Sequence, residues 1–245
     1  MMGIFDAGGP FLAWLDGHTA GMIPAVIRLA LWGLLSGLVS MLLYRWLSDQ
    51  EGIGRGKREL KAAQHALNAF DGELKEAWPL MRRLMRISLG QVGRVGWPAV
   101  VASLPLLFLL SWMSGSYAYH YPPPGSTPRI EAWPAGLNAR WVAPAPADRN
   151  PTPRIAVSDG AGRIVAMVNM KAPTPIIGKH RWWNVFIGNP SGYLPDHGQA
   201  ERLHISLPAI QYLPIGPGWM RGWELPFFVS LIAMSLVLKT VMRIA

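Results

Sequence analysis

Three apolar runs, each about as long as a membrane-spanning helix, constrain this chain more than any other feature. They cover residues 23–44, 95–113 and 223–243. A hydrocarbon layer of about 30 Å needs roughly 20 helical residues at about 1.5 Å each. Charged residues make up only 15% of the chain, whereas a soluble domain averages roughly 25%. We therefore expect a membrane α-helical protein with three transmembrane helices. The alternative, three buried core helices, would leave little chain to cover them.

Basic residues gather on one side of the first two runs. They are Arg45, Arg55, Lys57, Arg58 and Lys61 after the first run, and Arg82, Arg83, Arg86 and Arg94 before the second. Lys and Arg close to the ends of transmembrane helices remain in the cytoplasm. This rule predicts that the segment between the two runs is cytoplasmic.

The remaining topology follows from that assignment. Residues 1–22 are expected outside, 45–94 in the cytoplasm and 114–222 outside, with the C-terminus in the cytoplasm, as in a bacterial inner-membrane protein. The net charge of +9 is then explained by membrane orientation and attraction to anionic lipid rather than by nucleic-acid binding. The expected partners are the lipid bilayer and other membrane proteins, which would be substrates or complex subunits.

Aromatic and basic residues near the ends of the runs are expected to anchor the protein at the membrane interfaces. On the outer side these anchors are Trp14, Trp112, Trp219 and Trp223. On the cytoplasmic side they are Arg94, Lys239 and Arg243.

The cytoplasmic segment carries an apolar residue at alternating steps of three and four. The series is Leu60, Ala63, Leu67, Phe70, Leu74, Ala77, Met81 and Leu84. This spacing predicts a helical, coiled-coil-like segment. Two shapes fit: one long helix from Lys57 to about Arg86, or a helix broken at residues 71–73 or Pro79 into a hairpin or an elbow. Gly52, Gly54 and Gly56 weaken any helix before Lys57.

Residues 114–222 differ from the rest of the chain because they are rich in Pro and Gly. Residues 119–128 and 141–153 indicate extended, polyproline-like chain. Residues 154–170 contain two β-rich runs around Asp159-Gly160, which predicts a hairpin. Residues 182–188 and 202–215 suggest further strands. The expected product is a small β-rich, sandwich-like domain on the outer face.

Candidate catalytic chemistry is sparse. The chain has no cysteine, and it contains no nucleophile-elbow, zinc-protease, phosphate-loop or dinucleotide motif. The outer segment holds His180, Asp196, His197 and His204, but their spacing matches no compact metal-ligand motif. We therefore expect no catalytic residues, no metal and no cofactor. A membrane-bound enzyme that uses the outer domain has no residue to support it.

The junction after the first run carries a family resemblance. Residues 42–64, LLYRWLSDQEGIGRGKRELKAAQ, leave an apolar run through R-x-L-x-D-Q-E into a Lys/Arg-rich helix. With the order of the three runs, this resembles the YidC/Oxa/Get1 superfamily of membrane insertases, above all its archaeal YidC-like branch and the third subunit of the ER membrane protein complex. The resemblance implies a cofactor-free three-helix core with a hydrophilic groove, a positive charge in that groove, and a cytoplasmic loop whose methionines capture a client helix.

Four residues are candidates for those implied roles. Arg28 is the only charge well inside a run and would be the groove charge; the alternatives are snorkelling to outer headgroups or pairing with Asp16 or Glu224. Arg45 fits the family junction, with an interfacial anchor as its alternative. Met81 and Met85 would contact substrate, or else serve as seam positions or surface anchors.

Two functions remain open from the sequence. The first is an insertion or assembly factor for membrane proteins, non-enzymatic, with an insertase-like core. The second is a structural or accessory subunit of a larger membrane complex. The second run departs from the family because Ser103 and Ser111 are its main polar residues, and the minimal family members lack an outer domain between their second and third spans.

Overall fold

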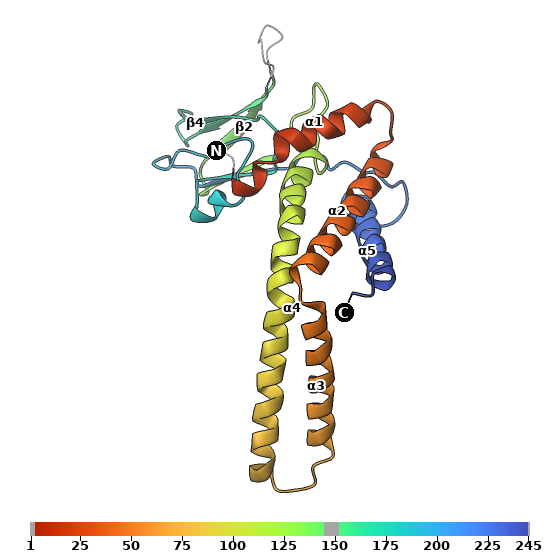
Figure 1. The fold of residues 1–245 in the computed structure, drawn as a ribbon. Helices are drawn as coiled ribbons and strands as arrows, with labels where there is room; N and C mark the ends of the chain where they lie inside the picture. The colour runs from red at the N-terminus through yellow and green to blue at the C-terminus, as the bar shows by residue number, and fades with distance from the viewer. Residues whose placement is uncertain (1–2, 145–151, 245) are drawn as a thin grey trace. The chain divides into compact units, whose positions relative to one another are not determined.

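Five α-helices and six short strands make up most of the chain in the computed structural model, which describes residues 3–144 and 152–244 (Figure 1). The α-helices are α1 (Gly9–Ala20), α2 (Ala25–Leu47), α3 (Gln50–Asn68), α4 (Leu74–Ser116) and α5 (Glu224–Val241). The strands are β1 (Ile130–Trp133), β2 (Asn138–Val142), β3 (Arg154–Ser158), β4 (Ile164–Asn169), β5 (Ile176–Gly178) and β6 (Arg202–Ile205). Short 3-10 helices are η1 (Ile4–Asp6), η2 (Trp182–Val185) and η3 (Gly218–Met220).

The chain forms two compact units. One contains Met1–Arg28 and Leu107–Leu225, and includes the strands. The other contains Leu29–Leu106 and Pro226–Ala245, and is helical.

Within the described residues, three helices are long and apolar enough to cross a membrane, as the sequence predicted. They are α2, the Lys75–Ser116 part of α4, and α5. The helix that carries the second predicted span begins before residue 95, because α4 starts at Leu74 and includes Pro79, Pro98 and Pro105. The basic, amphipathic residues before the apolar run keep helical periodicity, so the helix continues through the predicted boundary.

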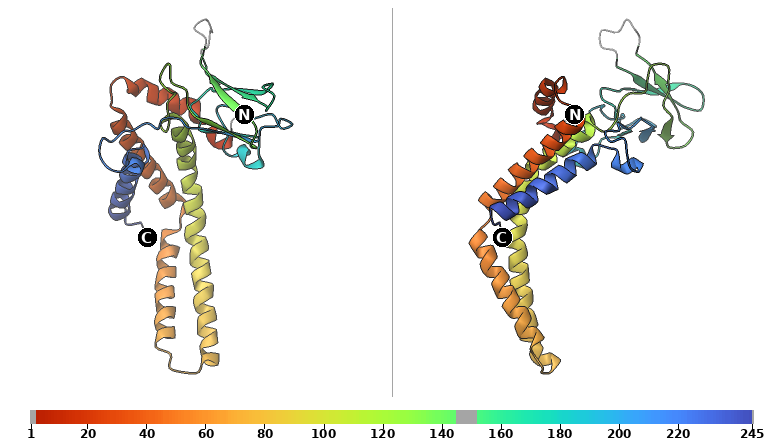
Figure 2. Two further views of the ribbon diagram at one scale, coloured as in Figure 1. Left: turned by 180° about the vertical axis from the view of Figure 1, so that it is seen from behind. Right: turned by 90° about the vertical axis from the view of Figure 1, so that its right-hand side faces the viewer.

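Helices α3 and α4 form an antiparallel hairpin, which decides between the two shapes that the sequence left open. The chain reverses over residues 69–73, the predicted break. Gln91 on α4 donates from Nε2 to the carbonyl oxygen of Ile53 on α3 at 3.1 Å, and the two helices lie side by side in both rotated views (Figure 2).

The reversal corrects the predicted apolar seam. The first three seam residues lie on α3, Phe70 lies in the turn and the last four lie on α4, so the seam is not continuous along one helix. Ala63 and Ala77 are buried in the two arms, whereas Met81 is exposed. Regular spacing on both sides of a turn cannot reveal whether the chain continues or doubles back, because each arm keeps its own period.

Helix α3 starts at Gln50, earlier than the expected Lys57, and its glycines have contacts that explain this. Asp49 caps the helix by accepting the backbone N–H of Gly52 at 2.9 Å, which satisfies one of the free N–H groups of the first turn. A Cβ at Gly56 would lie 2.0 Å from Oε1 of Gln91. The propensity cost of glycine is therefore outweighed by a cap and a close helix–helix approach.

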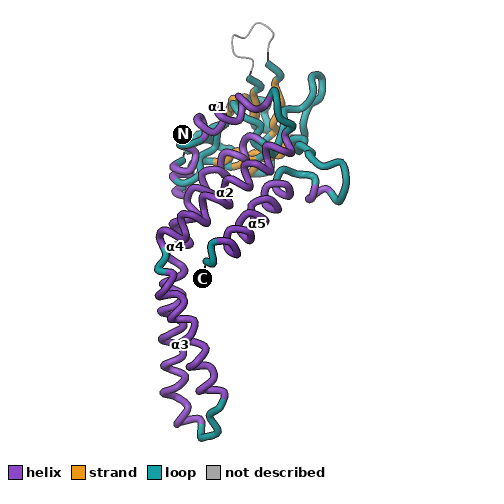
Figure 3. The backbone as a smooth tube through the Cα atoms, turned by 45° about the vertical axis from the view of Figure 1, so that its right-hand side comes forward, coloured by secondary structure: helices purple, strands orange, loops and turns teal. Residues whose placement is uncertain are grey.

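Helices α2 and α5 also lie side by side (Figure 3), and glycines on α2 allow the contact. A Cβ at Gly33 would lie 2.1 Å from Oγ of Ser230 and 2.3 Å from the carbonyl oxygen of Phe227. A Cβ at Gly37 would lie 2.8 Å from the carbonyl oxygen of Leu231. Small residues spaced by four allow apolar helix backbones to approach closely in membranes.

The strands form two antiparallel, three-stranded sheets in the orders β1-β6-β5 and β2-β3-β4. One apolar core contains buried residues from both sheets: Ile155, Val157, Ala166, Val168, Ile177, Leu203 and Ile205. Residues 114–222 therefore contain antiparallel β structure, as predicted, including the predicted hairpin, β3–β4. Strands β1 and β2 were not predicted, and of the expected extended segment 141–153, residues 145–151 lie outside the described residues.

Two predicted strands are wrong in whole or in part. Residues 182–188 contain η2 rather than a strand, because the Asn184 side chain accepts from the N–H of Arg181 at 2.7 Å and donates to the Ile187 carbonyl at 3.2 Å. These local bonds close a turn that competes with a strand. Of residues 202–215, only β6 is a strand.

Candidate functional site

Arg28, the candidate groove charge, lies near the start of α2 and is paired with α1. Its guanidinium contacts the carboxylate of Asp16 and also donates to the Asp16 carbonyl oxygen at 3.3 Å. The two side chains are 13% and 14% exposed. Helix α1 was not predicted, although Pro10 lies in its first turn, where proline favours the start of a helix; Asp16 was one of the two partners considered for Arg28.

Two tyrosines complete this cluster. The Tyr117 hydroxyl, just after α4, donates to Asp16, and the Arg28 guanidinium carbon lies 5.7 Å from the centroid of the Tyr117 ring. The Tyr212 hydroxyl donates to the Tyr117 carbonyl oxygen at 3.0 Å. The Asp16 cluster (Asp16, Arg28, Tyr117 and Tyr212) therefore ties α1 and α2 to the end of α4 and to the segment before α5.

The Asp16 cluster has little net charge with which to attract a ligand. Burial raises the pKa of Tyr117, and its hydrogen bond to Asp16 raises that pKa further. Burial likewise raises the pKa of Tyr212 to about 12. Both phenols are consequently neutral at physiological pH, and the Arg28 cation is balanced by the Asp16 anion. This geometry stabilises the fold around Arg28 rather than presenting an uncompensated positive charge.

Because folding raises the pKa of Tyr117 and Tyr212, we expect the protein to lose stability at alkaline pH. A phenol whose pKa is raised by folding stabilises the protein fully below the unfolded pKa of about 10 and loses that stabilisation as the pH rises further. We expect the free energy of unfolding to fall between about pH 10 and pH 12, and Tyr212→Phe to reduce this dependence. This pH dependence can be measured from the free energy of unfolding at each pH, with tyrosinate absorbance reporting the ionisation of the phenols. An unchanged pH profile in Tyr212→Phe would contradict the assignment.

Several serine hydroxyls inside the apolar helices donate hydrogen bonds to carbonyl oxygens of their own helix. Ser36 donates to the Trp32 carbonyl at 2.7 Å, and Ser230 donates to the Pro226 carbonyl at 2.8 Å. Such bonds satisfy hydroxyls without lining a hydrated space. Among the described residues, Ser40 Oγ and Arg28 Nε are buried without a hydrogen-bond partner.

Met81 and Met85 belong to a longer apolar stripe on α4. The α4 stripe consists of Trp78, Met81, Met85, Leu89 and Val92, which are 58%, 39%, 66%, 67% and 67% exposed. Steps of three and four place these residues on one helix face. The residues that meet α3 occupy another face, which includes Ala77 and Gln91.

Basic residues border the α4 stripe on its other side. They are Arg82, Arg83 and Arg86, all exposed, and the Arg82 guanidinium carbon lies 5.9 Å from the Trp78 ring centroid. Met81 and Met85 were predicted from the sequence, whereas Trp78, Leu89 and Val92 were not. These residues could have been found from the sequence, because apolar residues at steps of three and four also form a second series on α4, on a different face from the seam.

The predicted interface anchors divide into two groups. Trp14 and Trp219 are exposed, as are Arg45, Arg94, Lys239 and Arg243. Trp112 and Trp223 are instead buried, with 8% and 7% of their surfaces exposed. These two indoles fill space inside the protein, so they do not present their rings to a surrounding interface.

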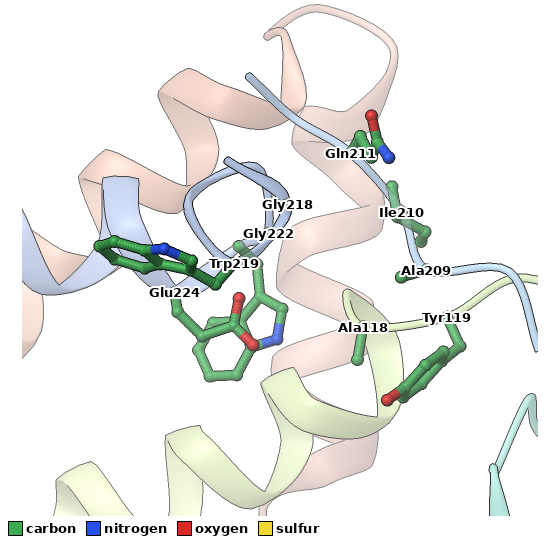
Figure 4. A pocket seen from close by; sticks show the side chains of 10 residues that line it. Ala118, Tyr119, Ala209, Ile210, Gln211, Gly218, Trp219, Gly222 and Glu224 are labelled. Atoms are coloured by element: carbon green, nitrogen blue, oxygen red, sulfur yellow. The ribbon is translucent and has the colours of Figure 1, made fainter. Parts of the chain in front are cut away.

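A cavity of about 380 Å³ lies where α4 ends and α5 begins (Figure 4). Tyr119, Gln211, Trp219 and Glu224 contribute side chains to its wall. The wall has a carboxylate, an amide and aromatic rings, but it lacks a nucleophile paired with a base. Within residues 3–144 and 152–244, no three His, Cys, Asp or Glu residues gather as metal ligands.

Comparison of the chain with protein-family models, curated proteins and solved structures found no match in any of the three. The resemblance to the insertases therefore stays a prediction that depends on the junction sequence and the order of elements.

Proposed function

We propose that this chain is a non-enzymatic factor for the insertion or assembly of membrane proteins. The observation that carries the proposal is the α3–α4 hairpin, which follows the first apolar helix and exposes the α4 stripe on the arm that continues into the second. The resemblance to the YidC/Oxa/Get1 superfamily supports the same function. The proposed location is the bacterial inner membrane, with the hairpin and the C-terminus in the cytoplasm.

In this proposal the α4 stripe holds the apolar helix of a client before that helix enters the bilayer. Methionine side chains are flexible and polarisable, so Met81 and Met85 suit clients of different shapes. The stripe lies on the same helix as the apolar run from residue 95, which gives a bound helix a continuous apolar path. Arg82 and Arg86 beside the stripe would favour clients with acidic residues next to their apolar helix.

Arg28 has no groove role in this proposal. A buried charge paired with a carboxylate and stacked on a ring is already compensated, so attraction of a polar client segment would need a different group.

A second function, a structural subunit of a larger membrane complex, is favoured by one specific observation. Gly33 and Gly37 bring α2 into close contact with α5, so these two helices leave no room between them for a polar client segment. In this alternative the α4 stripe would bind one permanent partner helix rather than passing clients.

Insertion by the purified chain tests the proposal. Proteoliposomes that contain the chain should protect a short-tailed, single-span client from protease more than empty liposomes do. Met81→Glu with Met85→Glu should return protection close to that of empty liposomes, because an unpaired carboxylate against an apolar helix costs several kcal/mol. Equal protection with and without the chain would argue for the structural subunit.

The matched control is Ala62→Glu with Ala66→Glu on α3. Both residues are exposed on the same hairpin, so the control adds the same charge outside the stripe. We expect it to keep the protection of the unmodified chain.

A further inference from the structure

We infer that residues 181–188, here named the Trp turn, insert into the outer leaflet of the bilayer beside α4. This inference does not depend on the proposed function, since it needs only that α4 crosses a membrane with its Ser116 end on the outer side.

The Trp turn presents an exposed apolar surface on a compact frame. Its exposed apolar residues are Trp182, Trp183, Val185, Phe186 and Ile187, with Trp182 the most exposed at 74%. Hydrogen bonds from the N–H groups of Phe186 and Ile187 to the Trp183 carbonyl, at 3.0 and 3.3 Å, close the turn. None of the residues described in the apolar core of the β structure comes from the Trp turn.

The N-terminal residues attach the Trp turn to α4. The Asp6 carboxylate accepts hydrogen bonds from the backbone N–H of Gly188 at 2.7 Å and from the Ser111 hydroxyl on α4. The Phe5 ring stacks on Phe186 at 6.2 Å and meets Phe108 edge-on at 5.2 Å between centroids.

Backbone contacts tighten the same junction. The N–H of Phe5 donates to the Phe186 carbonyl at 2.9 Å, and a Cβ at Gly3 would lie 2.5 Å from that carbonyl oxygen. In Figure 1 the turn, drawn in cyan, lies close to the N-terminal end of the chain. All of these residues belong to one compact unit.

The position of the attachment along α4 identifies the surroundings of the turn. Phe108 precedes the end of α4 at Ser116 by about 12 Å at about 1.5 Å per residue, and both Phe108 and Ser111 lie in the apolar run. A surface held at that depth meets hydrocarbon and headgroups rather than water. Trp is enriched at this boundary, and the exposed Arg181, whose guanidinium carbon lies 5.6 Å from the Trp183 ring centroid, suits lipid phosphate.

The absence of cysteine from the chain makes a single-site probe specific. Ile187→Cys carries an environment-sensitive fluorophore in the full chain, reconstituted into vesicles of phosphatidylethanolamine and phosphatidylglycerol. Ile164→Cys on β4 is the matched control, because Ile164 is 61% exposed and Ile187 is 55% exposed. Lipid with a nitroxide on its acyl chain is present in both leaflets, so the orientation of the reconstituted chain does not affect the result.

We expect nitroxide lipid to quench the probe at position 187 at least twofold more than the probe at 164. Aqueous iodide should give the opposite order. Equal weak quenching by nitroxide lipid at the two positions, with equal access to iodide, would overturn the inference and would leave the turn as a surface for a protein partner.

Discussion

Asp16→Ala should destabilise the protein by about 3–5 kcal/mol, the range for removing one partner of a buried ion pair. Arg28 would be left largely buried without its counter-ion, and Tyr117 would lose the acceptor of its hydroxyl. Unfolding of the purified chain in mixed micelles, followed by circular dichroism, measures the change.

The control is an exposed pair in the same unit. Arg129 and Glu131 form an ion pair with side chains that are 79% and 44% exposed, so Glu131→Ala should cost only about 0–1 kcal/mol. Asp16→Ala combined with Arg28→Met should cost less than the sum of the two single changes, because no charge then remains unpaired. Additive losses, or an Asp16→Ala effect as small as that of Glu131→Ala, would contradict a structural role for the cluster.

Gly33→Val should separate α2 from α5 and cost about 1–3 kcal/mol or more, as overpacking does. Two of the atoms that a side chain at Gly33 would approach, the Phe227 carbonyl oxygen at 2.3 Å and the Leu231 nitrogen at 3.1 Å, belong to the backbone of α5. A rotamer change cannot relieve those contacts, so the helix itself must move. The same micelle unfolding assay reports the loss.

Gly96→Ala on α4 is the control for adding a side chain to a helical glycine. Apart from its chain neighbours and the nearby backbone of its own helix, no described atom lies within 4 Å of a Cβ at Gly96. Alanine is favoured over glycine in a helix by up to about 1 kcal/mol. We expect Gly96→Ala to be neutral or stabilising. If Gly33→Val behaved in the same way, the close α2–α5 contact would be wrong.

Composition and period were enough to predict the three apolar helices and the β3–β4 hairpin. A run of about 20 apolar residues and an Asp-Gly between two β-rich runs each have one dominant solution. The sequence could not show whether the chain reverses at residues 69–73, because apolar residues recur at steps of three and four both before and after this segment. The start of α3 was predicted too late because Gly56 allows a close contact with Gln91 on α4, and a contact with a residue so far along the chain cannot be read from local sequence.

The candidate site was less predictable for the same reason. Arg28 stands out in the sequence as a charge in an apolar run, but its role depends on Asp16 and Tyr117, which different helices supply or position. The Trp turn resembles a strand because Trp, Val, Phe and Ile favour strands, whereas Asn184 closes it into a turn. The α4 stripe could have been found by searching for a second apolar face after the first was assigned to α3.

Photocrosslinking from the α4 stripe can show whether this surface captures client helices. A photoreactive group on Met85→Cys should form an adduct with a short-tailed client made in the presence of proteoliposomes, and the adduct should require the client's apolar helix. The same group on Ala62→Cys, exposed on α3, should form little. Equal adducts at the two positions, or none at position 85 while insertion proceeds, would contradict capture of clients by the α4 stripe.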